Sequence, residues 1–144
     1  MTRKKKVVVN LTITNPDLSR LAEALQVTLR RHDGGKKGYW HPPSRTITTR
    51  RGLSIAEYKS TLAHEIAHAF HGDTPTGDIY STRQELRADR WAANLLINPS
   101  EAKTVLYCYQ HLEPAAYELE VTKHLLRVWV ANNQHLLDCR ADWG

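Results

Sequence analysis

Residues 62–72 have the sequence Leu-Ala-His-Glu-Ile-Ala-His-Ala-Phe-His-Gly. Within this stretch His64, Glu65 and His68 form the pattern His-Glu-x-x-His. On an α-helix, positions i and i+4 lie on one face, so the two imidazoles can supply two ligands to a single zinc ion. Glu65, beside them, can take a proton from a water molecule held there. The stretch therefore predicts a metal-binding helix that needs a third ligand from elsewhere in the chain.

The third ligand is expected on the next predicted helix, about residues 83–97. A catalytic zinc usually has three protein ligands and one open position. Glu85 is the candidate for the third ligand, and Asp89 lies one turn later on the same face. Asp89 can accept the free ring N–H of one histidine, most simply His64. The alternatives are that Glu85 closes a capping box with Thr82, that Asp89 faces solvent, and that both histidines are ordinary helix residues.

Four more side chains are candidates for contacting the substrate or stabilising an oxyanion. His71 shares the histidine face of the helix but stands at a helix end, where a structural role is the commoner one. Tyr39, Tyr80 and His111 complete the set. Nothing in the sequence ranks them.

Composition indicates one globular domain over residues 1–144. Hydrophobic residues make up 41% and charged residues 24%, as in ordinary soluble domains. No apolar run approaches the roughly 20 residues of a membrane span. The basic N-terminus precedes a short apolar run that polar residues interrupt, without a cleavage site, so we expect no signal peptide and a cytoplasmic protein. Cys108 and Cys139 are too few for a disulfide scaffold, and both are expected to be reduced and packed among apolar neighbours.

Charge is unevenly distributed along the chain. Residues 1–52 hold twelve Lys/Arg and three Asp/Glu, whereas residues 53–144 hold eight and twelve. A solvated basic surface is the simpler interpretation. Direct binding of nucleic acid by the basic third is possible but not favoured.

The N-terminal third is predicted to contain both strands and a helix. Residues 7–13 are β-prone, residues 17–31 have leucines at helical spacing, and the prolines after Tyr39-Trp40-His41 enforce an extended segment. Residues 45–50 are rich in β-branched residues, and their polarity predicts an edge strand. Such an edge could hold an extended peptide substrate as an added strand.

The rest of the chain is predicted to be helical. Ser54 and Glu57 form a capping box that begins the motif helix near Ile55, and Gly72 ends it. One stripe of this helix should face the core, with His64 and His68 turned away from it. The stripe comprises Ile55, Tyr58, Leu62, Ile66 and Ala69. Asn98-Pro99-Ser100-Glu101 begins another helix, and a last helical region covers residues 114–137.

Two segments together resemble the ImmA/IrrE family of metallopeptidases. They are Leu-Ala-His-Glu-Ile-Ala-His at 62–68 and Glu-Leu-Arg-Ala-Asp-Arg-Trp-Ala-Ala-Asn-Leu-Leu-Ile-Asn-Pro at 85–99. The similarity is specific over about residues 45–100. Residues 119–129 look like the helix-turn-helix-like tail of some members, and residues 1–40 match nothing in the family pattern.

The resemblance implies an α+β fold of the zincin type, with a small antiparallel sheet, an active-site helix and further helices. It also implies Zn²⁺ on His64, His68 and Glu85, with Glu65 as the catalytic base of an endopeptidase. Members typically cleave a helix-turn-helix repressor that a mobile element or stress system encodes nearby. The alternative is a zincin-fold binding module that sequesters such a protein without cleaving it.

Overall fold

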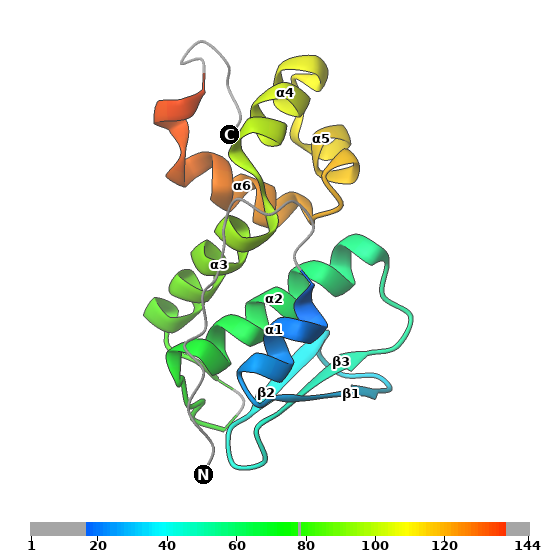
Figure 1. The fold of residues 1–144 in the computed structure, drawn as a ribbon, viewed down its shortest axis with the longest axis vertical. Helices are drawn as coiled ribbons and strands as arrows, with labels where there is room; N and C mark the ends of the chain where they lie inside the picture. The colour runs from blue at the N-terminus through cyan, green and yellow to red at the C-terminus, as the bar shows by residue number, and fades with distance from the viewer. Residues whose placement is uncertain (1–16, 78, 138–144) are drawn as a thin grey trace.

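The computed structural model describes residues 17–77 and 79–137. This part of the chain is an α+β domain with six α-helices and a three-stranded sheet, which confirms the predicted fold class (Figure 1). In chain order the elements are α1 Leu18–Ala24, β1 Thr28–His32, β2 Gly38–His41, β3 Thr46–Arg50, α2 Ile55–His71, α3 Thr82–Leu96, α4 Pro99–Tyr109, α5 Leu112–Glu118, α6 Lys123–Asn132 and a 3-10 turn Gln134–Leu136. The β-prone residues 7–13 and Cys139 lie outside the described residues.

The helix predicted over residues 17–31 is only half correct. Asp17 caps α1 by accepting from the Arg20 backbone N–H, but the helix ends at Ala24. Gln26 then adopts a left-handed backbone with φ of 59°, which reverses the chain. Val27 is buried and Thr28 begins β1, because β-branched residues fit an extended strand better than a helix. The leucine spacing alone did not reveal this break.

The sheet has the order β1-β3-β2, so the predicted edge strand is in fact central. β3 pairs in parallel with β1 and antiparallel with β2, which makes the sheet mixed rather than antiparallel. Ile47 and Thr49 are buried beneath α2, whereas the alternate residues Thr46, Thr48 and Arg50 face the opposite side. The polarity of β3 thus reflects an uncovered sheet face. Because both its edges are paired, β3 cannot accept a substrate strand. Among the described residues, β2 is the edge strand that contacts α2.

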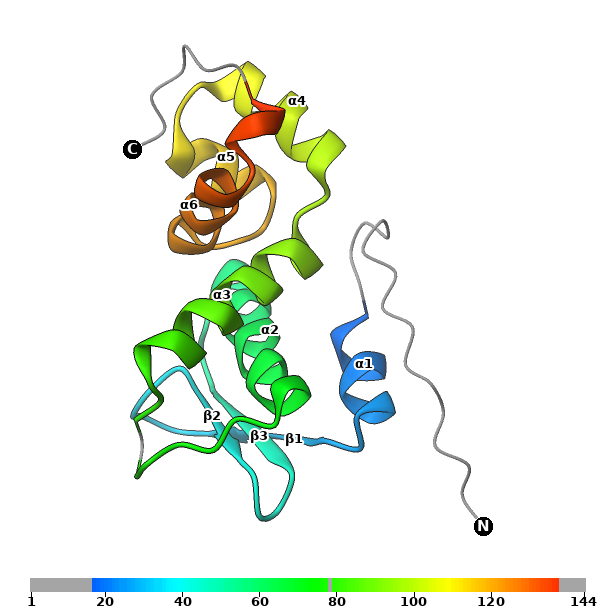
Figure 2. The same cartoon turned by 90° about the vertical axis from the view of Figure 1, so that its left-hand side faces the viewer.

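α2 begins and ends where the sequence predicted. Ser54 and Glu57 form the capping box, and Gly72 provides a left-handed C-cap with φ of 68°. Leu62, Ile66 and Ala69 are buried as expected, but Ile55 is 65% exposed. The histidine face points away from this stripe, yet His68 is fully buried, because α3 and the loop before it cover that face (Figure 2).

α3 lies alongside α2 and leads from the sheet toward the C-terminal helices (Figure 2). Its capping box is Ser81 with Gln84, not Thr82 with Glu85, so Glu85 is not used as a cap. Three small residues on its inner side let the two helices approach closely. They are Ala88, Ala92 and Ala93, all buried.

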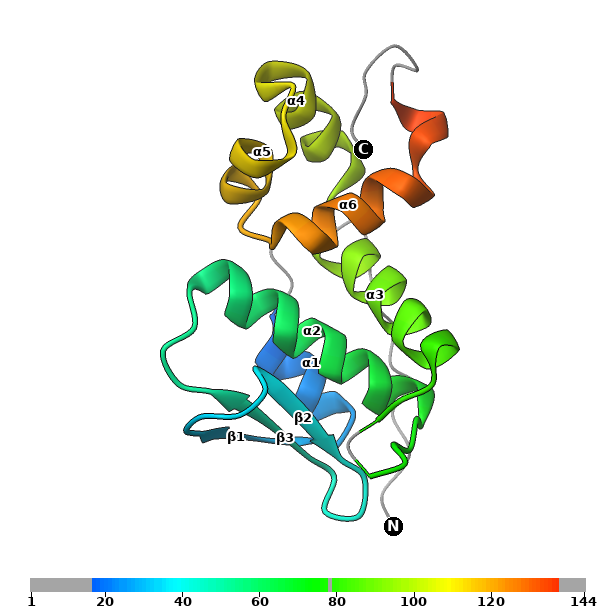
Figure 3. The same ribbon diagram turned by 180° about the vertical axis from the view of Figure 1, so that it is seen from behind.

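The C-terminal helices α4, α5 and α6 form a helical module at the far end of α3 (Figure 3). Asn98 caps α4, as predicted. The single helical region predicted over residues 114–137 is divided, because Glu120 has φ of 55° and interrupts it. Trp129 is buried in this module, whereas Cys108 is exposed, contrary to expectation. Among the described residues no helix is long and apolar enough to cross a membrane.

Candidate metal centre

Three side chains from α2 and α3 converge on one point. Oε1 of Glu85 lies 2.8 Å from Nε2 of His68 and 3.2 Å from Nε2 of His64. The two Nε2 atoms are 3.1 Å apart. The fold therefore brings the three predicted residues together, because the turn of α2 that carries His64 and His68 faces the first turn of α3, which carries Glu85.

The second ring nitrogen of each histidine faces a different carboxylate. Nδ1 of His64 lies 2.8 Å from Oδ1 of Asp89, and Nδ1 of His68 lies 2.8 Å from Oδ2 of Asp73. An ionised carboxylate only accepts, so both Nδ1 atoms carry the proton and donate. In the neutral histidines both Nε2 lone pairs then point toward the Glu85 oxygen. Three acceptors meeting in this way can be satisfied by a cation between them, either a proton or a metal ion.

The pKa values of the two histidines shift in opposite directions. Burial by itself would lower the pKa of His64, but hydrogen bonds to Asp89 and Glu85 outweigh it and raise that pKa to about 10. For His68 burial dominates, and its pKa falls below the ordinary value. The pKa of Glu85 is also lowered, chiefly by its hydrogen bond to His64. Without a metal, His64 is therefore protonated on both ring nitrogens, and its Nε2 proton lies toward Glu85, where a metal ion would lie.

Asp73 is a member of the site that sequence reasoning missed. It is buried at 3% exposure, and its other carboxylate oxygen accepts from the Arg87 guanidinium on α3. Its backbone carbonyl accepts from Nε1 of Trp40 on β2, at 3.1 Å. Asp73 thus fixes the His68 ring while joining β2, the α2–α3 loop and α3. Its position just after the Gly72 cap was the only signal for it in the sequence.

Asp89 is shared between two histidines. Its Oδ2 accepts from Nε2 of His124 at 2.9 Å, while Oδ1 accepts from His64. His124 belongs to α6, so this contact connects the helical module to the cluster. Burial would raise the pKa of Asp89, but the hydrogen bonds to the two histidines lower it overall. No pattern in the sequence pointed to His124.

Glu65 stands beside the cluster with one carboxylate oxygen unsatisfied. It is buried at 7% exposure, and Oε2 has no hydrogen-bond partner among the described residues. Burial raises the pKa of Glu65 to about 7, against the opposing influence of His64. A carboxyl group with this pKa can accept and return a proton near neutral pH.

Two clefts meet at Glu65. The first, of about 390 Å³, is bounded by rings and prolines together with Glu65. Its ring and proline residues are Tyr39, Trp40, His41, Pro42, Pro43, Pro75 and Tyr80. The second, of about 550 Å³, includes His64, Asp89 and His124 in its wall.

The other predicted contact residues are only partly gathered here. The Tyr80 ring stacks on His68 with centroids 3.7 Å apart, and its buried hydroxyl has no partner among the described residues. His71 instead donates to the Ala67 carbonyl and contacts the rings of Phe70 and Trp91, away from both clefts. His111 stands at the N-cap of α5 in the helical module, also outside the clefts.

The cluster fits a small divalent cation. Two nitrogens and one carboxylate oxygen are donors that zinc prefers, at about 2.0–2.2 Å each, which implies about 3.4 Å between ligands in a tetrahedron. The observed separations of 2.8 to 3.2 Å fall a few tenths of an ångström short. A slight outward movement of the side chains would therefore admit the ion.

An α+β domain whose central helix presents His-Glu-x-x-His to a carboxylate from the next helix is a zincin-like metallopeptidase fold. The chain belongs to peptidase family M78, since the profile of the IrrE N-terminal-like domain matches residues 22–128. The match extends the predicted similarity, about residues 45–100, to include the sheet and most of the helical module. No curated protein matches the chain.

Proposed function

We propose that this chain is a zinc-dependent endopeptidase, with His64, His68 and Glu85 as the metal ligands. The observation that carries the proposal is that Nε2 of His64, Nε2 of His68 and Oε1 of Glu85 lie within 3.2 Å of one another. The other ring nitrogen of each histidine faces a carboxylate. When bound, the zinc would act as a Lewis acid on the scissile carbonyl and on water. Asp89 and Asp73 orient the two histidine ligands by accepting hydrogen bonds from their Nδ1 atoms.

Glu65 is the proposed general base. Its unsatisfied Oε2 and its pKa of about 7 support this role, because the group must take a proton from water and pass it to the leaving amine. Tyr80 borders the same cleft, and its hydroxyl has no partner among the described residues, which makes it the preferred candidate for hydrogen bonding to the developing oxyanion. The pKa of Tyr80 is raised by burial, so that hydroxyl keeps its proton.

The substrate is proposed to be an extended protein segment lying along β2. Within residues 17–77 and 79–137 this strand has an unpaired edge and contacts α2, and its residues border both clefts. Its backbone groups can pair with a peptide and present the scissile bond to Glu65. A DNA-binding repressor with a helix-turn-helix domain remains the expected substrate from the family resemblance.

The decisive experiment compares the zinc-loaded chain with its Glu65→Gln variant on the repressor encoded beside its gene. We expect discrete fragments from the parent protein and a loss of rate of at least about 100-fold in the variant, since a positioned base contributes about 10²–10⁴-fold. Both proteins should retain equal zinc. Stable complex formation without fragments would instead favour a binding module, and absence of bound zinc would refute the metal site itself.

A further inference from the structure

The outer face of the sheet carries no described helix. α1 and α2 both lie on the opposite face, where Trp40, Ile47 and Thr49 are buried (Figure 1). Pairing places alternate residues of the three strands on the outer side. They are Thr28, Arg30 and His32 of β1, Tyr39 and His41 of β2, and Thr46, Thr48 and Arg50 of β3. We call this set the outer sheet face.

Three rings form a row across the outer sheet face. The centroids of His32 and Tyr39 are 5.2 Å apart, and those of Tyr39 and His41 are 5.9 Å apart. Nε2 of His32 donates to the Lys36 carbonyl, which holds the ring at one end of the row. Flat rings on an open sheet are surfaces on which unpaired bases can stack.

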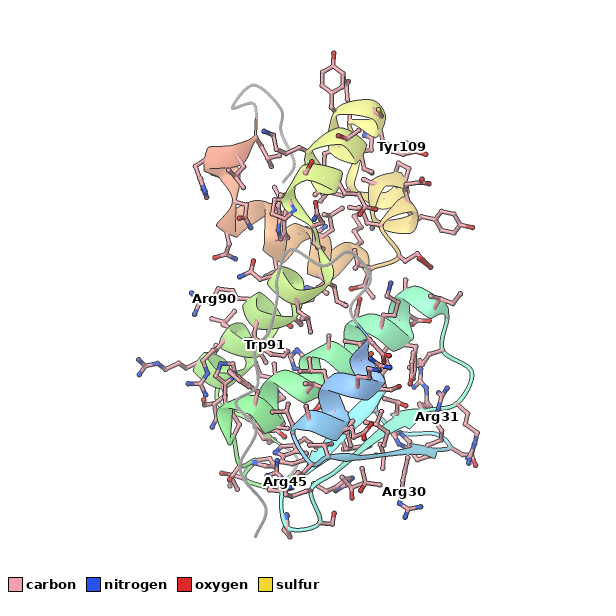
Figure 4. The ribbon with its side chains drawn as sticks, viewed as in Figure 1. Arg30, Arg31, Arg45, Arg90, Trp91 and Tyr109 are labelled. Atoms are coloured by element: carbon pink, nitrogen blue, oxygen red, sulfur yellow. The ribbon has the colours of Figure 1, made fainter. Side chains whose placement is uncertain are left out.

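The outer sheet face carries two arginines, Arg30 and Arg50, and no carboxylate among the described strand residues. None of the 14 strand residues is Asp or Glu. Arg30 is exposed and projects from β1 away from α2 (Figure 4). The Arg50 guanidinium donates to the Gly35 carbonyl, which is neutral. Asp33, the one acid within residues 28–51, is already paired with Arg51 at 3.1 Å.

We infer that the outer sheet face binds single-stranded nucleic acid, an activity separate from the proposed peptidase. Uncompensated arginines match a phosphate backbone, and the row of rings distinguishes this partner from an acidic peptide, which offers nothing to stack. A duplex keeps its bases stacked internally and could use only the charges. Binding here would occupy the side of the sheet opposite to α2, although Tyr39 and His41 also border the first cleft.

The test measures binding of a fluorescein-labelled 12-nucleotide oligothymidylate to the full chain by fluorescence anisotropy. We expect binding at 50 mM salt that weakens as salt rises. Arg30→Glu should weaken it at least about fivefold and reduce the salt slope by about 0.7, because one phosphate is then no longer neutralised. Tyr39→Leu should also weaken it at least about fivefold, whereas Tyr39→Phe keeps the ring and should retain binding.

The matched control is Arg127→Glu, the same charge reversal at an exposed residue of α6. It should leave binding within about twofold, because it lies in the helical module. Absence of binding at 50 mM salt, or an equal loss in Arg127→Glu, would overturn the inference. So would equally tight binding of a 12-base-pair duplex or of a labelled oligoglutamate peptide. Because Arg30 is exposed, its variant remains informative even where Tyr39→Leu does not fold.

Discussion

Each histidine of the candidate centre donates from Nδ1 to a carboxylate, and this contact orients its ring with Nε2 toward the cluster. For His68 the carboxylate is Asp73, which also pairs with Arg87. Asp73→Asn keeps the shape of the side chain but removes its negative charge. The hydrogen bonds that it accepts from His68 and Arg87 should therefore weaken. We therefore expect zinc affinity to fall about 10–100-fold, measured by competition with a chromophoric chelator. An unchanged zinc affinity would mean that Asp73 stabilises only the α2–α3 loop and does not influence the metal site. The control is Asp33→Asn, the same substitution in the exposed loop after β1.

The proton on His64 leads to a pH-dependent metal affinity. Its pKa is raised to about 10, so the metal-free protein carries this proton at neutral pH, and the metal must displace it. Affinity should therefore rise with pH, by about tenfold from pH 6.5 to pH 7.5 for one displaced proton. Isothermal titration of zinc in buffers of different ionisation enthalpy would detect the release. A pH-independent affinity would contradict the assignment of the proton to His64.

Residue spacing could identify side chains that share a helix but not those that reach the site from elsewhere. His64 and His68 stand at i, i+4 spacing on one helix, and Glu85 and Asp89 do so on the next, so each pair projects onto one helix face. Asp73 lies in a loop whose course depends on the left-handed Gly72. His124 arrives from α6, whose packing on α3 depends on the whole fold.

At the scale of elements, the close approach of β2 to α2 depends on a residue without a side chain. A Cβ added at Gly38 would lie 2.6 Å from Cγ2 of Thr61 and 3.1 Å from Cγ of Glu65. Gly38→Ala should therefore push β2 from the helix, destabilise the domain by about 1–3 kcal/mol and reduce peptidase activity by displacing Glu65. Thermal unfolding and cleavage assays would measure the two effects. The second substitution Thr61→Ser removes the obstructing methyl and should restore stability; failure to do so would contradict the steric explanation.

Element boundaries were predictable where local chemistry determines them. Ser54 with Glu57, Gly72 and Asn98 are caps that act within one turn, and each is found where the sequence indicated. The end of α1 at Ala24 and the central position of β3 were not predictable, because strand pairing decides them. A strand pattern gives the buried face, here Ile47 and Thr49, but does not say which neighbours lie on either side.

At the scale of the molecule, the site joins parts that are distant in sequence. Oγ of Ser60 on α2 accepts from the Thr122 backbone N–H at 3.1 Å, and His124 binds Asp89 from the same turn of chain. The helical module is thus tied to α2 and α3 within a few residues of the proposed metal ligands. Ligand binding at the cluster and folding of the whole domain should consequently be coupled.

This coupling predicts that zinc stabilises the folded chain. A ligand that binds only the native state at 100 times its dissociation constant adds about 2.7 kcal/mol, which for a domain of this size corresponds to about 5–10 °C in melting temperature. Differential scanning fluorimetry with and without zinc would measure it. Glu85→Gln removes the anionic ligand and should abolish most of the shift, whereas His111→Gln, outside the cluster, should leave it intact. An equal shift in Glu85→Gln would place the ion elsewhere, because a bound metal stabilises the fold only through the residues that hold it.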